Sequence, residues 1–160
     1  MDGISEILAT YNCVSLDEKI QFELDGVVEK EIKQAYCIEN LEFCVSCMDY
    51  TTLKVSDTEE SVKNFTADLL KKLKKFNLRD VAAVCVFSNY AGIVREGLKG
   101  TEIQTAVVAG NFPNSQTFTE IKLAECKMAI GAGAQEVDVV ISVGDILEKN
   151  YPQACRKMGI

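Results

Sequence analysis

An aspartate within a short run of β-branched residues is the position best suited to chemistry. Asp138 stands in the segment Glu136–Val140, whose alternation puts Val137 and Val139 on one face of a strand and Asp138 on the other. If the valines pack beneath helices, the carboxylate points into the opposite face, where it needs a hydrogen-bond donor or a cation. Such a group is a candidate proton relay or lysine partner. A structural aspartate that ties down a loop fits the pattern equally well.

Polar residues also follow three other apolar runs, at the points where those runs end. They are Asp49–Thr52, Ser88–Asn89 and Asn111–Ser115. Parallel βα proteins build their sites at the carboxyl ends of neighbouring strands, so we expect these segments to meet at one edge. Each segment alone is typical of a turn, and only their shared position favours a site.

The chain has seven cysteines and no histidine. Cys44–Cys47 has the CxxC spacing of redox and zinc sites. It lacks both the second ligand pair of a structural zinc site and the helix N-terminus of a thioredoxin-type site. We therefore expect these cysteines in the core of a protein that resides in a reducing cytoplasm.

The hydrophobic pattern predicts alternating strands and helices after about residue 40. The expected strands are 43–49, 81–87, 102–109 and 136–142, and the expected helices are 56–76, 88–98, 117–132 and one from about 145. Ser56–Glu59 has capping-box spacing, and Lys71–Lys75 falls where cations stabilise a helix end. Gly131–Ala134 follows a helix and precedes a strand, so it predicts a helix C-cap rather than a dinucleotide loop.

Two parts of the chain differ in pattern. Residues 1–40 predict a helical extension, with helices near 4–11 and 15–36. Residues 41–160 predict a single α/β domain of four parallel βα units. A full (β/α) barrel needs about 200 to 250 residues, so these units form either half a barrel or a four-stranded open sheet.

Composition excludes several classes of partner. The net charge is −7, whereas nucleic acids and anionic membranes require a cationic surface. Apolar runs such as Val81–Phe87 are much shorter than the ~20 residues of a membrane span. The first residues, Met1–Glu6, lack the basic and apolar parts of a signal peptide. We therefore predict a cytoplasmic chain.

Four segments together resemble, in order and spacing, the first four strand motifs of the deoxyribose-phosphate aldolase family. They are Met48–Leu53, Val81–Val86, Asn111–Pro113 and Gly133–Val140, within a likeness that covers residues 41–150. The resemblance implies the N-terminal half of a TIM barrel and a class I aldolase, a lyase of deoxyribonucleotide catabolism. That enzyme reversibly cleaves 2-deoxy-D-ribose 5-phosphate to D-glyceraldehyde 3-phosphate and acetaldehyde. It uses a lysine Schiff base and needs no metal or organic cofactor.

The resemblance also implies roles for individual residues. Asp138 matches the catalytic acid of strand four, which relays protons around the carbinolamine and the Schiff base. The matched substrate-binding positions are Asp49, Thr51, Leu53, Cys85 and Phe112. The family's Schiff-base lysine on strand six, its second lysine on strand seven and its phosphate site after strands seven and eight have no counterpart here. The lysines that are present are expected to be solvated.

Two functional hypotheses follow. The first is an aldolase by descent whose 160 residues end before the catalytic lysines, so that the chain is inactive alone. The second is a non-catalytic half-barrel that self-assembles, or complements another fragment, through the open edges of strands one and four. Both favour a homo-oligomer. A flavodoxin-like binding module is disfavoured because no phosphate-cradling loop follows the first strand.

Overall fold

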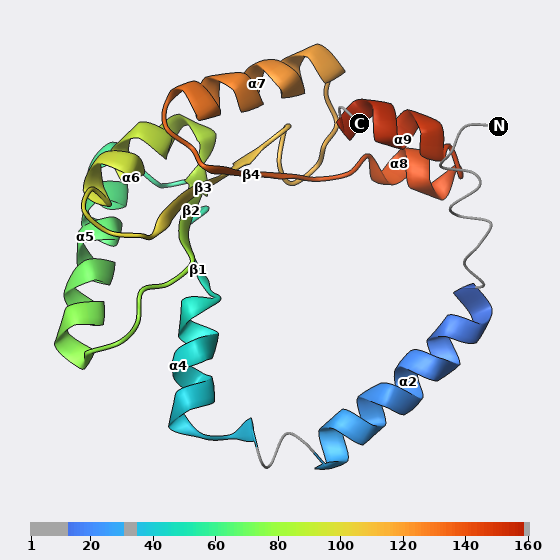
Figure 1. The fold of residues 1–160 in the computed structure, drawn as a ribbon. Helices are drawn as coiled ribbons and strands as arrows, with labels where there is room; N and C mark the ends of the chain where they lie inside the picture. The colour runs from blue at the N-terminus through green and yellow to red at the C-terminus, as the bar shows by residue number, and fades with distance from the viewer. Residues whose placement is uncertain (1–12, 31–34, 159–160) are drawn as a thin grey trace. The chain divides into compact units, whose positions relative to one another are not determined.

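The computed structural model describes residues 13–30 and 35–158. The chain divides into two compact units, Met1–Leu41 and Glu42–Ile160, and each is described by itself. The described part of the first unit contains α2, Cys13–Lys30 (Figure 1). The helix expected at residues 4–11 lies outside the described residues. A further helix, α4 (Ile38–Ser46), begins in the first unit and ends in the second.

The second unit is built on a parallel sheet with the strand order β1-β2-β3-β4. The strands are β1 (Asp49–Thr51), β2 (Ala83–Phe87), β3 (Gln104–Ala109) and β4 (Glu136–Val139). The helices that follow them are α5 (Glu59–Phe76), the 3₁₀ turn η1 (Ser88–Tyr90) with α6 (Ala91–Gly97), α7 (Thr119–Gly131), α8 (Val143–Leu147) and α9 (Tyr151–Met158). This order confirms the predicted α/β architecture of a partial (β/α) barrel.

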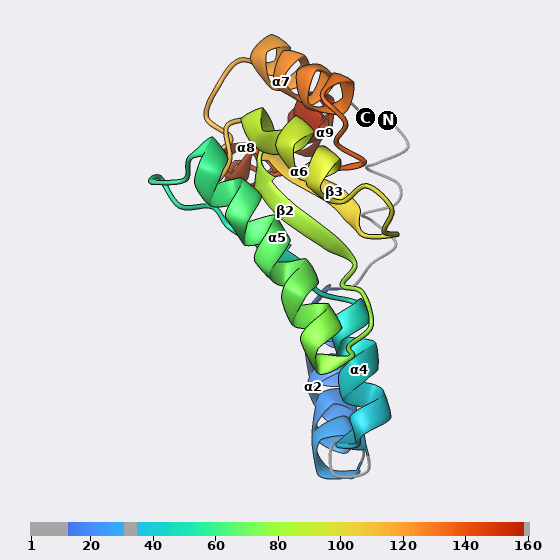
Figure 2. The same ribbon diagram turned by 90° about the vertical axis from the view of Figure 1, so that its left-hand side faces the viewer.

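The two faces of the sheet differ in what covers them. Helices α5, α6 and α7 lie over one face (Figures 1 and 2). Beneath them, Val84 and Val86 of β2 and Val107 of β3 are fully buried in the main core. Burial of each valine stabilises the fold by about 1.5–3 kcal/mol. On the opposite face, a smaller apolar cluster receives side chains only from strands and strand-end loops among the described residues. We call this the uncovered face.

The first strand begins later than the sequence predicts. Residues 43–46 belong to α4, and β1 starts only at Asp49. The alternation around Phe43 suggests a half-buried strand, but this side chain is 61% exposed, so the alternation marks no buried face. A strand also needs a partner. The Met48 carbonyl accepts a hydrogen bond from the Ala82 amide (3.0 Å), which is where pairing with β2 begins.

The cap of α5 also differs from the prediction. Thr58 is the N-cap, and its partner is Ser61: the Ser61 amide donates to Thr58 Oγ1 (3.1 Å) and the Thr58 amide donates to Ser61 Oγ (2.8 Å). Asp57 instead accepts hydrogen bonds in the loop that follows β1, from Thr52 Oγ1 and the Lys54 amide. In the predicted capping box, Ser56 would be the N-cap and Glu59 would bond back to its amide. In the observed capping box Ser61 takes the place of the glutamate, because its hydroxyl accepts a hydrogen bond from the amide of the N-cap, Thr58.

The predicted ends of α5 and α7 are confirmed. Lys74 and Lys75 occupy the last turn of α5, where their positive charges interact favourably with the negative end of the helix dipole. Helix α7 stops at Gly131 and is followed by Gly133 with φ +111°. A Cβ atom at Gly133 would lie 2.9 Å from Arg95 Cγ, so both the backbone conformation and the space require glycine.

Candidate active site

The uncovered face carries the polar residues that the sequence singles out. Paired residues of neighbouring parallel strands share a face, and Thr51 pairs with Cys85 while Cys85 pairs with Ala106. In β4, Asp138 pairs with Val108, which belongs to the same cluster as Cys85. Val137 packs against the core beneath the helices instead. The alternation of β4 is therefore as predicted.

Cys85 and Asp138 meet across this face. The Cys85 thiol donates to Asp138 Oδ2 over 3.9 Å, although the two residues lie on strands separated by β3. Burial, and after it the carboxylates of Asp138 and Asp49, raise the pKa of the Cys85 thiol from 9.0 to about 11, while a hydrogen bond from Thr51 opposes them. The thiol is therefore protonated at neutral pH and acts as a donor rather than as a nucleophile.

Apolar side chains surround this polar pair. Leu53 from the loop after β1 and Phe112 from the loop after β3 pack on the cluster that contains Cys85 and Val108. The structure thus gathers Leu53, Cys85, Phe112 and Asp138 on the uncovered face. Asp49 and Thr51 act on the Cys85 thiol through charge and hydrogen bonding, so both also lie next to it.

Glu125 of α7 is a residue that sequence reasoning missed. Its Oε2 accepts hydrogen bonds from the amides of Gly110 (2.9 Å) and Asn111 (3.2 Å), and its Oε1 accepts one from Ser88 Oγ (2.8 Å). The carboxylate therefore joins the ends of β2 and β3. No sequence motif predicts this role. An acidic residue on a helix is usually solvated, so Glu125 does not stand out in the sequence.

Lys122 contradicts the expectation that every lysine is solvated. Its side chain is 3% exposed, and its ammonium donates to Ser115 Oγ. Burial lowers the pKa of Lys122, as does the neighbouring Lys157, whereas Asp145 raises it. Helical spacing could have predicted the burial of Lys122. It lies two turns before Ala129, and these two are the buried residues of α7.

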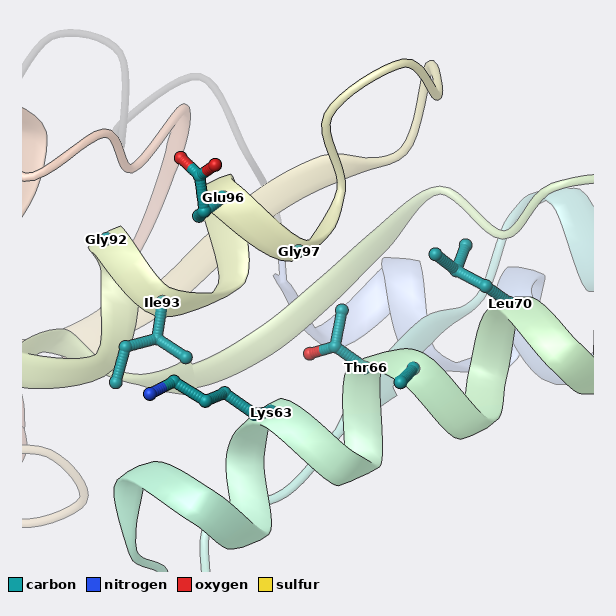
Figure 3. Close-up of a pocket in the computed structure, with 8 residues that line it drawn as sticks. Lys63, Thr66, Leu70, Gly92, Ile93, Glu96 and Gly97 are labelled. Carbon is teal, nitrogen blue, oxygen red and sulfur yellow. The ribbon is translucent and has the colours of Figure 1, made fainter.

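The larger cavities lie elsewhere. One of about 580 Å³ is formed by side chains such as Lys63 and Leu70 of α5 and Ile93 and Glu96 of α6 (Figure 3). Another of about 600 Å³ lies between Ser88–Asn89 and α7. Neither is lined by any of the six candidate residues. We interpret both as grooves between neighbouring helices, because the groups with chemical capacity converge on the uncovered face instead.

The prediction that Cys44 and Cys47 lie in the core is wrong. Cys44 and Cys47 are both exposed, since α4 has no buried residue. In the described ranges, no group of three or more histidine, cysteine, aspartate or glutamate side chains could hold a metal ion. Likewise, none of the described helices is long and apolar enough to cross a membrane.

Comparison with known proteins identifies relatives. No family model matches the chain. A deoxyribose-phosphate aldolase of Clostridium novyi is 43% identical over 104 residues, which is 65% of this chain but only 43% of that protein. The Clostridium tetani enzyme of the same name is 40% identical over 104 residues, 65% of this chain and 44% of that protein. The chain therefore spans less than half the length of the curated relatives it matches.

The fold gives the same result. A Coccidioides immitis protein, provisionally assigned as a deoxyribose-phosphate aldolase, matches 72% of this chain and 43% of its own, with a TM-score of 0.63 and 26% identity. By sequence and by fold, this chain is related to the deoxyribose-phosphate aldolases.

Proposed function

We propose that the uncovered face is the strand-one-to-four half of a deoxyribose-phosphate aldolase active site. The reaction would be the reversible cleavage of 2-deoxy-D-ribose 5-phosphate to D-glyceraldehyde 3-phosphate and acetaldehyde. The observation that carries the proposal is the position of Asp138, whose carboxylate projects from β4 beside the Cys85 thiol on the uncovered face.

In this proposal Asp138 moves protons. Attack of a lysine amine on the substrate carbonyl gives a carbinolamine, and its hydroxyl must gain a proton to leave as water when the imine forms. Asp138 relays that proton and later takes one from the C3 hydroxyl, so that the C–C bond breaks and the electron pair enters the enamine. Cys85, protonated, donates a hydrogen bond that fixes the carboxylate. Leu53 and Phe112 exclude water, and Asp49 and Thr51 bind substrate hydroxyls.

Among the described residues, no lysine forms a hydrogen bond or an ion pair with Asp138. Lys122 is buried near this end of the sheet, but it lies on α7, which covers the opposite face from Asp138. We therefore propose that the nucleophile and the phosphate site come from a complementary half-barrel. The 160 residues alone should give no imine on the uncovered face and no turnover.

Complementation tests this function. The chain is co-expressed with the part of the Clostridium novyi relative that it does not match, and cleavage of deoxyribose phosphate is measured with borohydride trapping of the imine. We expect turnover from the pair alone, lowered roughly 10²–10⁴-fold by Asp138→Asn. Asp80→Asn, an exposed aspartate before β2, is the matched control and should not change the rate. Equal rates with Asp138→Asn would remove the proposed role.

A second proposal, self-association, is favoured by the strand edges. Within the described residues, β1 pairs only with β2 and β4 pairs only with β3, so each has one unpaired edge. The uncovered face adds apolar side chains such as Leu53 and Phe112. We propose that two copies meet through these edges and faces, as a non-catalytic assembly when no complementary half is present.

Sedimentation of the purified chain tests this assembly. A dimer should form, and Leu53→Lys should dissociate it because the lysine places a charge in the interface. Ile130→Lys, on an exposed position of α7, is the control. A monodisperse monomer that melts cooperatively would rule the assembly out.

A further inference from the structure

Two charged side chains of α7 reach the two ends of one strand-end loop. Lys122 and Glu125 are three residues apart, so they project from the same side of the helix. Between them passes the segment 110–115, which follows β3 and contains Phe112. Glu125 holds the start of this segment at Gly110 and Asn111. Lys122 holds its end at Ser115.

Each of these two contacts is linked by a further hydrogen bond to the end of a neighbouring strand. The same Glu125 carboxylate accepts a hydrogen bond from Ser88, the residue directly after β2. Ser115, while accepting from Lys122, donates its own hydroxyl proton to the carbonyl of Val140 (2.7 Å), directly after β4. The carboxyl ends of β2, β3 and β4 are therefore joined to one another through two side chains of one helix.

The residues joined in this way are close neighbours of the candidate catalytic groups. Val140 follows Asp138 by two positions, Ser88 follows Cys85 by three, and Phe112 lies inside the held segment. Lys122 and Glu125 both belong to α7, which lies on the other side of the sheet from the uncovered face. Their effect on the site must act through the strand ends.

Stability alone explains Lys122 poorly. A buried ammonium costs desolvation energy, and a methionine of similar length would fill the same space without that cost. The lowered pKa of Lys122 reflects this cost, since burial is its main cause. What a methionine cannot supply is the donor that holds Ser115.

We propose that Lys122 and Glu125 are positioning residues, which together set the separation of Cys85, Phe112 and Asp138 by clamping the ends of β2, β3 and β4. The proposal rests on the proposed function only in treating the uncovered face as an active site. The clamp itself is a statement about geometry, and it can be measured without substrate.

The Cys85 thiol reports that geometry. The full chain is prepared with its other six cysteines replaced by alanine, and the pKa of Cys85 is measured from the pH dependence of its alkylation. In the parent chain the pKa should be near 11 because the thiol is buried and because Asp138 and Asp49 lie close to it. In Lys122→Met the end of β4 is released and Asp138 moves away, so the pKa should fall by on the order of one unit.

The sign of the shift separates the clamp from simple electrostatics. Loss of a positive charge by itself disfavours the thiolate, so without a clamp the pKa of Cys85 in Lys122→Met would rise or stay constant. Lys127→Met removes a charge from an exposed position of the same helix and is the matched control, with no fall expected. Ser115→Ala breaks the same link without changing charge, and it should reproduce the fall even if Lys122→Met does not fold.

Thermal unfolding of each variant completes the test. A lower melting temperature with an unchanged Cys85 pKa in both Lys122→Met and Ser115→Ala would show that the contacts are merely structural, and the proposal would be wrong. The outcome is independent of catalysis. If the complemented pair lacks aldolase activity while the pKa still falls, the clamp stands and the proposed function does not.

Discussion

The Cys85 thiol lies 3.9 Å from the Asp138 carboxylate, although β3 separates the strands that carry them. The contact is possible because the side chains of β3 at this level are small or moderate: Ala106 and Val108 form the floor between the two groups. The Asp138 carboxylate placed in this way helps to raise the pKa of the Cys85 thiol, after the effect of burial.

Removal of the carboxylate charge should lower the pKa of Cys85. Asp138 is the second cause, after burial, of a pKa near 11, so Asp138→Asn should bring the value down without returning it to 9.0. The measurement is the pH dependence of thiol alkylation in a chain with Cys85 as its single cysteine. Glu102→Gln, an exposed position before β3, is the control, and an equal shift in that variant would mean that the effect is not local.

Cys85 should also make stability depend on pH. Its folded pKa is raised from 9.0 to about 11, so the folded state keeps the proton that the unfolded state has lost. This contribution to stability is fully present below pH 9 and is lost as the pH rises towards 11, in total roughly 2 to 3 kcal/mol. Denaturant unfolding at several pH values measures it. Cys85→Ala should flatten this part of the profile, whereas the exposed Cys47→Ala should not.

Gly110 should tolerate no side chain. Its φ is +74°, and a Cβ atom would lie 2.9 Å from Val139 Cγ1, so Gly110→Ala suffers both backbone strain and a clash in the sheet. We expect a loss of about 2–4 kcal/mol. Gly100→Ala is the matched control: φ is +84° but the space is open, so only the strain of about 1 kcal/mol remains. Similar losses from the two substitutions would contradict the clash.

The cap of α5 gives a direct comparison of sequence pattern and structure. Thr58→Ala removes the hydroxyl that accepts the Ser61 amide and should cost about 1 kcal/mol of unfolding free energy. Ser56→Ala, at the position that the sequence pattern favours as the cap, should change stability by less than about 0.5 kcal/mol. Chemical denaturation of both variants decides between the two positions.

Sequence reasoning located the strands of the second unit well where long apolar runs define them. β2 and β3 fall within the expected ranges because buried parallel strands are apolar on both faces, and β4 does so because its valines alternate with polar residues. β1 was misplaced, because its start depends on the hydrogen bond from the Ala82 amide, just before β2, rather than on any local pattern. The six candidate residues could be named from their motifs, but their roles in catalysis stay predictions.

The supporting residues could not be predicted in the same way. Glu125 and Lys122 look like ordinary charged positions of an exposed helix. Their importance comes from contacts with Gly110 and Ser115, residues brought to them by the turn after β3. Tertiary contacts of this kind are set by how the helix packs on the sheet, and a single sequence carries little trace of them.

The strand order β1-β2-β3-β4, identical to the order along the chain, bears on how the fold assembles. Each strand pairs with the one synthesised just before it, so every pairing closes a loop of only a few tens of residues. Pairing between consecutive units keeps the contact order below that of a sheet whose paired strands lie far apart in the chain, although each parallel pairing still has to close a crossover loop. Each βα unit can pack against the preceding unit while the ribosome is still synthesising the following one. The sheet can therefore form one strand at a time, from β1 towards β4.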